Sequence, residues 1–295
     1  MVSTESLFSS DRAKEIIRKK KVILFDCDGV LWRSGVGLPS AAEFVNSLSP
    51  TKKVFFVTNN SGGTPAHLTS KLARIGITAT EDQVISAPLV TAKVLSARGV
   101  KKVFLLANTN MVSYLKSSGI EAIEADFSMN PNDIDGDSFT DPAVQAVVAG
   151  ATQDLNYSSL AQALQYLLKP EVAFIATNRD PTFPGAHSML PGANTVVSAL
   201  IGCSGRQPEV MGKPEPFVYE ALEEMYGIDR KDCVIVGDRL STDIELAVRG
   251  GSTSILVLTG VTPAESWHEM AESMGVIPDA VVGGVADIVG WDVVE

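Results

Sequence analysis

Short apolar runs alternate along the chain with longer segments in which apolar residues recur every third or fourth position. The short runs predict strands buried on both faces, and the longer segments predict helices with one buried face. The predicted strands cover residues 22–26, 54–57, 84–86, 103–106, 144–149, 172–176, 234–236 and 255–258. The predicted helices cover residues 9–20, 40–48, 64–75, 88–98, 109–118, 156–168, 193–202 and 214–226.

This alternation of strands and helices favours parallel strand pairing with right-handed crossovers. A second round of alternation begins near residue 99 and ends in a proline-rich loop over residues 178–192. We therefore expect an α/β fold with a doubly wound, parallel-sheet (Rossmann-like) core. Residues 1–98 and 191–295 would form this core, and residues 99–190 would form a smaller α/β cap domain inserted into it.

Two further helices are predicted from the residues at their N-termini. Thr242 with Glu245, and Thr262 with Glu265, have the spacing of a capping box. In a capping box both side chains accept hydrogen bonds from backbone N–H groups that the helix leaves free. Gly250 would end the first of these two helices.

Polar residues follow directly after three of the predicted buried strands. Because the carboxyl ends of parallel strands meet at one edge of a sheet, where ligands bind, we expect these side chains to converge. Buried carboxylates are costly unless a positive charge neutralises them, and Mg²⁺ prefers carboxylate oxygens. The sequence therefore predicts a magnesium site at this edge. The polar residues that follow the three strands are Asp26 and Asp28, then Thr58, Asn59 and Asn60, and then Asp238, and the carboxylates among them are the candidate metal ligands.

Composition and charge disfavour some classes of binding partner for this protein. The chain has 295 residues, which suggests two domains, and its net charge is −11. This acidity disfavours nucleic acid as a partner, because binding to its backbone needs a basic surface. The first twenty residues hold no apolar core of a signal peptide, and no apolar run reaches membrane length, so we expect no membrane association.

The three cysteines bear on the compartment. Cys27, Cys203 and Cys233 show no paired spacing, which favours a reducing compartment and predicts a cytoplasmic protein. Cys27 stands between Asp26 and Asp28, and alternation along the strand points it away from both carboxylates. We expect Cys27 and Cys233 to pack as small buried apolar residues, and a redox role for Cys27 stays open.

Four short motifs, in chain order, resemble those of the haloacid dehalogenase-like superfamily. Asp26-Cys27-Asp28-Gly29-Val30 resembles the first motif, Thr58-Asn59 the second and Lys213 the third, and residues 237–244 resemble the fourth. Over nearly its whole length the chain is similar to the phosphoglycolate / 4-nitrophenyl phosphatase family, a relative of pyridoxal phosphate phosphatase. The stretches that carry this closer likeness are residues 25–33, 58–61 and 212–214.

The resemblance implies a Mg²⁺-dependent phosphatase that works through an aspartyl-phosphate. Asp26 would be the nucleophile. Asp28 would protonate the leaving alcohol and then take a proton from the water that cleaves the intermediate. The metal would be bound by Asp26, by Asp238 and by Asp28, whose backbone carbonyl is the implied ligand.

Five further residues are implied around the phosphoryl group. Thr58, Asn59 and Asn60 would bind its oxygens, and Lys213 would add a positive charge beside them. Asp243 would orient water ligands of the metal. Each has an alternative interpretation: the Thr-Asn-Asn segment as a simple turn, Lys213 as a surface lysine, and Asp243 as an acid favoured by the first turn of a helix.

The cap would select the substrate, a small phosphorylated metabolite. Arg179 could pair with a substrate carboxylate, which would suit phosphoglycolate, or be a solvated loop residue. Phe183 stands where pyridoxal phosphate phosphatase has a histidine. We expect a 2-phosphoglycolate-type ester or 4-nitrophenyl phosphate as substrate, with pyridoxal, sugar or glycerol phosphates as alternatives. A non-catalytic phospho-ligand or protein binder and a phosphomutase are further alternatives, and the resemblance suggests a homodimer formed through the cap.

Overall fold

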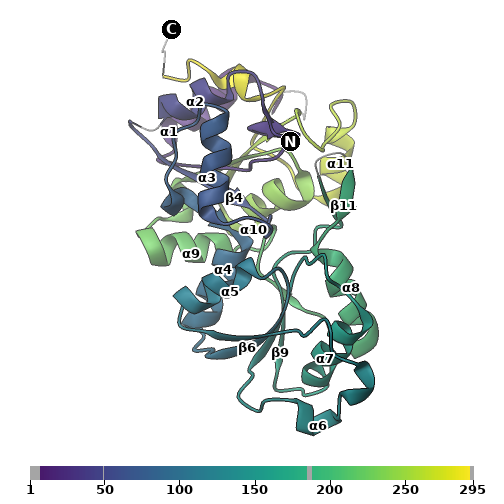
Figure 1. The fold of residues 1–295 in the computed structure, drawn as a ribbon. Coiled ribbons are helices and arrows are strands. Elements are labelled where there is room, and N and C mark those ends of the chain that lie inside the picture. Colours follow the sequence, from purple (N-terminus) through teal and green to yellow (C-terminus); the bar gives the residue numbers. More distant parts are fainter. Residues whose placement is uncertain (1–6, 49, 185–187, 293–295) are drawn as a thin grey trace. The chain divides into compact units, whose positions relative to one another are not determined.

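The computed structural model describes residues 7–48, 50–184 and 188–292, and the chain divides into two compact units (Figure 1). The first, here called the core unit, contains Met1–Thr58, Pro65–Ile85 and Lys213–Glu295. The second, here called the inserted unit, contains Asn59–Thr64 and Ser86–Gly212. The inserted unit has wider limits than residues 99–190, and the substrate-selecting role of that segment stays a prediction.

Helices and strands alternate through the core unit. Its helices are α1 (Ser10–Lys19), α2 (Ala41–Leu48), α3 (Pro65–Arg74), α9 (Phe217–Tyr226), α10 (Glu245–Gly250) and α11 (Trp267–Met274). Its sheet strands are β1 (Val22–Phe25), β4 (Lys53–Thr58), β5 (Val84–Ser86), β13 (Cys233–Gly237), β14 (Thr253–Val257) and β15 (Ala280–Val282). Shorter elements are β2 (Trp32–Arg33), β3 (Val36–Gly37), η2 (Glu81–Gln83), η4 (Arg230–Asp232), η5 (Leu240–Ile244) and η6 (Val285–Ile288).

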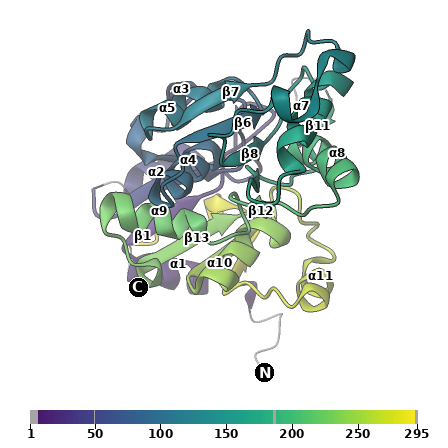
Figure 2. The ribbon, with the colours of Figure 1, turned by 90° about the horizontal axis from the view of Figure 1, so that it is seen from below.

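The core sheet has the strand order β15–β14–β13–β1–β4–β5. The pairings from β15 through to β4 are all parallel. Phe25 lies opposite Val236 of β13 and opposite Phe56 of β4. Figure 2 shows β1 and β13 side by side. The two strands that precede Asp26 and Asp238 are therefore neighbours, and both end at the same edge of the sheet.

Successive residues of β14 face opposite sides of the sheet. Ile255 and Val257 belong to an apolar cluster that includes residues of α1 and α2, whereas Leu256 belongs to a second cluster that includes Trp267 and Ala271 of α11. All three β14 residues are fully buried, and burial of each large apolar side chain stabilises the fold by about 1.5–3 kcal/mol. Helices thus cover both faces, which confirms the predicted doubly wound, parallel-sheet α/β core.

The inserted unit has its own parallel sheet, ordered β12–β9–β8–β6–β7. Its strands are β6 (Lys102–Leu106), β7 (Glu121–Glu124), β8 (Ala146–Ala149), β9 (Ala173–Ala176) and β12 (Glu209–Val210). Its helices are α4 (Ala87–Ala97), α5 (Asn110–Ser117), η3 (Pro131–Asp133), α6 (Gly136–Phe139), α7 (Tyr157–Leu167) and α8 (Ala193–Ser204). The two edge strands, β7 and β12, have too few apolar residues to be predicted from periodicity.

Part of the predicted loop over residues 178–192 is an antiparallel hairpin instead. Strands β10 (Thr182–Pro184) and β11 (Met189–Pro191) pair, with Phe183 opposite Leu190. Residues 185–187 of the predicted loop lie outside the described residues. The prolines in this segment led to the prediction of a loop, because proline has no N–H to donate to the hydrogen bonds of a central strand. It is tolerated at the edge of a hairpin.

Both predicted capping boxes are wrong. The segment Leu240–Ile244 forms a π-helical turn before α10, and the N–H of Arg239 is bound by the Asp243 carboxylate. Helix α11 begins at Trp267, well after Thr262, whose N–H donates instead to the carbonyl oxygen of Asp238. In both segments the described hydrogen bonds involve Asp243 or Asp238 and do not form a capping box at the start of a helix.

Within the described part of the chain, the longest apolar helices fall short of what crossing a bilayer requires.

Candidate active site

Three carboxylates gather at the carboxyl edge of the core sheet. Asp26 follows the last residue of β1, Asp238 follows the last residue of β13, and Asp243 comes from the π-helical turn that follows. One oxygen of each lies within 4.8 Å of the other two. Asp238 and Asp243 are buried, and the side chain of Asp26 is 14% exposed. Such a group of hard oxygen donors has the chemistry that suits a divalent cation such as Mg²⁺.

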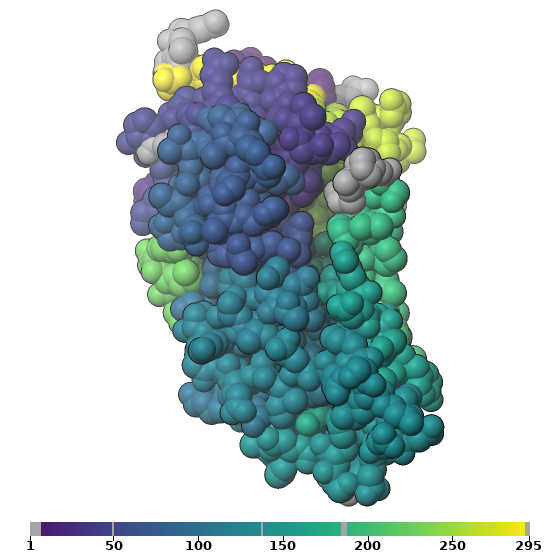
Figure 3. Space-filling view, viewed as in Figure 1, coloured from purple at the N-terminus to yellow at the C-terminus, as the bar shows by residue number. Residues whose placement is uncertain are grey.

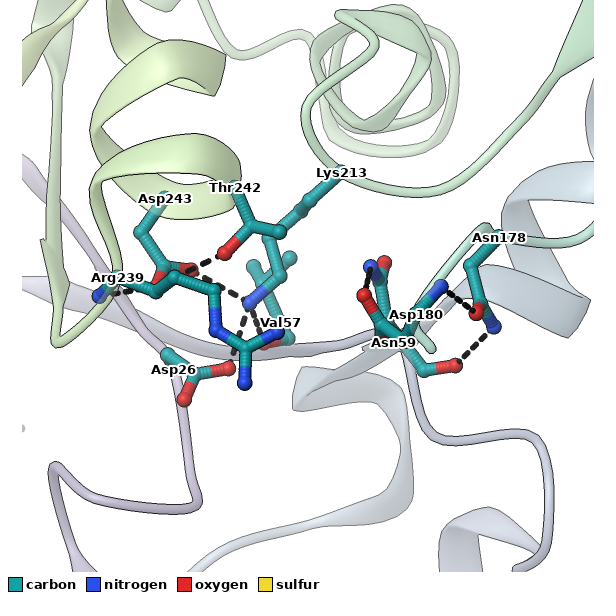
Figure 4. A network of polar contacts seen from close by, with 9 residues as sticks. All are labelled: Asp26, Val57, Asn59, Asn178, Asp180, Lys213, Arg239, Thr242 and Asp243. Carbon is teal, nitrogen blue, oxygen red and sulfur yellow. Dashed lines mark hydrogen bonds and ion pairs between the residues drawn. The ribbon is translucent and has the colours of Figure 1, made fainter. Parts of the chain in front are cut away.

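The ammonium of Lys213 contacts two of these three carboxylates. Its Nζ lies 2.5 Å from Asp26 Oδ1 and 2.6 Å from Asp243 Oδ1, and it also donates to the carbonyl oxygen of Val57 at 3.2 Å. Figure 4 shows the ammonium between the two carboxylates. With 5% of its surface exposed, Lys213 is a buried cation. The structure therefore excludes the alternative that it is a surface lysine.

The electrostatics of the group follow from burial. Burial raises the pKa of Asp26 well above its ordinary value, and Lys213 opposes that rise. Burial would lower the pKa of Lys213, but Asp243 and Asp26 together raise it above its ordinary value. Burial, and then Asp243, raise the pKa of Asp238 to about 6, against the opposing effects of the Val261 N–H, Lys213 and Arg239. Three carboxylates around one buried ammonium are short of positive charge, which a divalent cation would supply.

Two glycines let the backbone approach these carboxylates. A Cβ on Gly260 would lie 1.8 Å from Asp238 Oδ2, and a Cβ on Gly237 would lie 2.1 Å from the Cβ of Asp243. The N–H of Val261 donates to Asp238 Oδ2 at 2.6 Å. The loop after β14 therefore fixes the Asp238 carboxylate, and a side chain at either glycine would displace its neighbour.

Asp28 stands apart from this group in its contacts. Its Oδ1 accepts a hydrogen bond from Trp32 Nε1 at 2.7 Å and lies 3.6 Å from Lys71 Nζ. Its side chain is 38% exposed, so a ligand can reach it. The group of three carboxylates consists of Asp26, Asp238 and Asp243, and metal binding by the backbone carbonyl of Asp28 stays a prediction.

The Thr-Asn-Asn segment has three different environments. Thr58 closes β4 and is buried in the core unit. In the inserted unit, Asn59 is buried; its Nδ2 donates to Asp180 at 3.4 Å, and its carbonyl accepts from Asn178 Nδ2 at 2.8 Å. Asn60 is exposed, and its Oδ1 accepts the N–H of Gly62, a turn contact. Phosphate binding by these residues stays a prediction.

The residues expected to select the substrate lie in the inserted unit. Arg179 is exposed, and its Nε donates to Asn194 Oδ1 at 3.2 Å. Phe183 is half-buried in β10. This one described contact holds the guanidinium at the surface, where a substrate carboxylate could still pair with it.

Cys27 packs as predicted. It is 1% exposed and belongs to the core cluster with Phe25 and Trp32. Burial raises the pKa of its thiol well above the ordinary value, which disfavours the reactive thiolate. All three cysteines are free thiols.

Sequence reasoning missed Lys71, Arg239, Gly260 and Val261 as neighbours of the candidate catalytic groups. Lys71 is one of two basic residues, with Arg74, in the last turn of a mostly exposed helix, so no pattern distinguishes it. Val261 acts through its backbone N–H, which any residue would provide. Arg239 lies within the fourth motif and follows Asp238 directly in the sequence. Its positive charge next to that carboxylate could have identified it as a neighbour of the site.

Comparison with known proteins identifies the family. The model of the haloacid dehalogenase-like hydrolases matches residues 23–121, and a HAD-hydrolase-like model matches residues 210–288. The 4-nitrophenylphosphatase of Schizosaccharomyces pombe is 35% identical over 96% of this chain and 98% of its own length. Human chronophin is 32% identical over 93% of this chain and 94% of its own length.

Solved structures agree with these relatives. The p-nitrophenyl phosphatase from Archaeoglobus fulgidus superposes with a TM-score of 0.79 at 30% identity, covering 92% of this chain and 99% of that one. A glycerol phosphate phosphatase from Mycobacterium tuberculosis, in complex with magnesium, superposes with a TM-score of 0.78 at 25% identity, covering 92% and 77%. The family predicted from the four motifs is confirmed. The chain belongs to the haloacid dehalogenase-like hydrolases and is a phosphatase of the type that includes 4-nitrophenylphosphatase and chronophin.

Proposed function

We propose that this phosphatase is a Mg²⁺-dependent phosphomonoesterase that hydrolyses a small phosphorylated metabolite through an aspartyl-phosphate on Asp26. The observation that carries the proposal is the buried Lys213 ammonium, in contact with both Asp26 and Asp243 at the edge of the core sheet. A carboxylate held beside a fixed positive charge is suited to receive a phosphoryl group, whose negative charge the ammonium offsets.

The donor set fits a magnesium ion. Asp26 and Asp238 would bind it with carboxylate oxygens, together with the backbone carbonyl of Asp28. Crowding of carboxylates within 4.8 Å supports this assignment, as does the raised pKa of Asp238. When bound, Mg²⁺ offsets the repulsion between the anionic nucleophile and the anionic phosphate and polarises the phosphoryl oxygens.

In the first step, a carboxylate oxygen of Asp26 attacks phosphorus and forms an acyl phosphate. The bond between phosphorus and the alcohol oxygen breaks as Asp28 gives its proton to that oxygen, so the alcohol leaves neutral. Lys213, 2.5 Å from Asp26 Oδ1, holds the attacking carboxylate and afterwards neutralises the phosphoryl oxygens. The exposed side of Asp28 supports this role, because the leaving group must reach it.

In the second step, Asp28 takes a proton from a water molecule that attacks the same phosphorus. The bond between phosphorus and the Asp26 oxygen breaks, which releases inorganic phosphate and restores the carboxylate. Thr58, Asn59 and Asn60 would donate hydrogen bonds to the phosphoryl oxygens in both steps. Asp243 would orient water ligands of the metal, and its contact with Lys213 gives it a second task, that of positioning the ammonium.

The substrate is proposed to be an ester of a small alcohol, of the 2-phosphoglycolate type, with 4-nitrophenyl phosphate as a model substrate. Glycerol phosphate is a second candidate, favoured by the glycerol phosphate phosphatase among the structural relatives. Pyridoxal and sugar phosphates are further alternatives. Arg179 and Phe183 would make the choice, because Arg179 can bind a carboxylate in bidentate fashion and Phe183 presents an apolar surface.

The test is a panel of these esters, assayed with Mg²⁺ and with EDTA and ranked by kcat/KM. We expect Mg²⁺-dependent release of phosphate, lost in Asp26→Asn and retained in Asp82→Asn, which removes an exposed carboxylate of the same unit. Turnover that is unchanged by EDTA, or equal in Asp26→Asn and the wild type, would overturn the proposal. A panel in which Arg179→Ala loses only phosphoglycolate would assign the substrate.

A cytoplasmic location and a homodimer formed through residues 99–190 complete the proposal. Free thiols at all three cysteines support a reducing compartment. The molar mass of the wild-type protein, measured by light scattering, would test the dimer. A variant that lacks residues 99–190 can serve as the comparison if it folds.

A further inference from the structure

Two side chains converge on one oxygen of Asp28. Trp32 Nε1 donates a hydrogen bond to Oδ1 at 2.7 Å, and the Lys71 ammonium lies 3.6 Å from the same oxygen. The Lys71 ammonium also lies 4.1 Å from the centre of the Trp32 ring. The three groups therefore form a closed set of pairwise contacts, here called the Asp28 clamp.

Local backbone structure makes the clamp rigid. The N–H groups of Leu31 and Trp32 both bind the carbonyl of Cys27, and the N–H of Gly29 binds the carbonyl of Trp32 at 2.8 Å. Gly29 has a φ of +86°, a conformation that glycine adopts without strain. This turn returns the chain so that Trp32 lies against Asp28.

Burial fixes the donor and leaves the acceptor accessible. Trp32 is 0% exposed and belongs to the core cluster, so its indole has little freedom to move. Lys71 comes from α3, whose outer face is exposed to solvent and covers part of the core unit in Figure 3. The Lys71 side chain itself is 23% exposed, against 38% for Asp28. The clamp thus holds a carboxylate that still faces solvent.

The cation and the indole reinforce each other chemically. A cation within about 6 Å of an indole centre is attracted to the ring, and it withdraws electron density from it. This makes the N–H a stronger donor to the carboxylate, and hydrogen bonds to a charged acceptor are shorter and stronger than neutral ones. In the described contacts both groups reach Oδ1, and none is described at Oδ2.

We propose that Trp32 and Lys71 are positioning residues that hold Asp28 Oδ1, so that Oδ2 presents the proton transferred to the leaving alcohol. This inference rests on the proposed role of Asp28 as general acid. Loss of the clamp would leave the carboxylate free to rotate, and proton transfer would become slower. Substrates whose leaving group departs without a proton would be spared.

The test compares two esters of similar size under conditions that report kcat/KM. 4-Nitrophenyl phosphate releases a stable phenolate that needs no proton, whereas phenyl phosphate releases a more basic one that does. In Trp32→Phe the ratio of the two kcat/KM values should rise about tenfold in favour of 4-nitrophenyl phosphate, the loss expected for one hydrogen bond to a charged group. Lys71→Met should shift the ratio in the same direction by less, and Lys71→Arg should restore it.

A second tryptophan provides a matched control. Trp291 is also buried, donates through Nε1 to Ser47 Oγ at 3.1 Å, and lies under the ammonium of Lys52 at 5.0 Å, without a carboxylate partner in the described contacts. Trp291→Phe should leave the ratio unchanged. If Trp32→Phe fails to fold, Lys71→Met alone decides the outcome, because it leaves the core tryptophan in place.

Asp28→Asn separates failure of this inference from failure of the proposed function. If Asp28→Asn raises the ratio while Trp32→Phe and Lys71→Met leave it at the wild-type value, the clamp is overturned and the general acid stands. If Asp28→Asn itself leaves the ratio unchanged, Asp28 is not the general acid and both statements are overturned. A rise in all three variants, with none in Trp291→Phe, supports the clamp.

Discussion

Replacing Lys213 with methionine would remove the buried ammonium that contacts both Asp26 and Asp243. At 2.6 Å from Asp243, the ammonium gains about 6 kcal/mol of Coulomb attraction at an effective dielectric constant of about 20. Much of that gain only offsets the desolvation of the charges. Removing one partner of a buried pair typically costs about 3–5 kcal/mol, because the other charge stays buried without a partner.

We therefore expect Lys213→Met to lower the free energy of unfolding by about 3–5 kcal/mol, out of a total of about 5–15 kcal/mol for an ordinary domain. Urea denaturation in EDTA at neutral pH measures this loss. Lys21→Met is the control, because its ion pair with Asp232 is largely exposed and should contribute about 1 kcal/mol or less. A loss for Lys213→Met no larger than that of Lys21→Met would refute the reasoning.

The same variant has a predicted pH dependence. Burial raises the pKa of Asp26 in the fold, and removal of the ammonium would raise it further. A carboxyl group whose pKa is higher in the folded than in the unfolded protein destabilises the fold at pH values above its unfolded pKa. The deficit of Lys213→Met should therefore be small at acidic pH and grow as the pH rises. Adding Asp243→Asn to Lys213→Met should recover part of it, because one buried negative charge is gone.

Three further predictions concern a glycine beside Asp238, the metal and the cysteine thiols. Gly260→Ala places a Cβ 1.8 Å from Asp238 Oδ2, so kcat should fall at least about tenfold and half-saturation by Mg²⁺ should need more metal; Gly202→Ala, which meets nothing within 4 Å, should change neither. EDTA should abolish phosphatase activity, and added Mg²⁺ should restore it. Equal turnover by the metal-free protein would contradict this prediction. A thiol reagent should modify Cys203, the exposed cysteine, at once and the two buried thiols only after denaturation; equal rates would contradict the burial of Cys27.

Local sequence patterns were enough to predict the core sheet and its active edge. Four apolar residues before Asp26 and three before Gly237 form β1 and β13, and parallel pairing then brings Asp26 and Asp238 to one edge. These strands are visible in a short window of sequence, because burial on both faces leaves a strand of a parallel sheet with few polar positions.

Contacts made across long sequence distances escaped prediction. Thr242 and Glu245 fit a capping box, yet the turn there is shaped by the pairing of Asp243 with Lys213, which is 30 residues away. Asn59 follows Thr58 directly, but its side chain donates to Asp180 of the inserted unit. Tertiary contacts that satisfy buried polar groups override local preferences, and no window of sequence contains both partners.

The central claim is that phosphate passes through Asp26. Acid quench of Asp28→Asn at early times after mixing with 4-nitrophenyl phosphate, followed by mass spectrometry, tests it most directly, because loss of the base should slow hydrolysis of the intermediate. We predict a phosphorylated peptide that carries the group on Asp26 and decays at the rate of turnover. Steady release of phosphate with no phosphorylated Asp26 at any quench time would contradict the account.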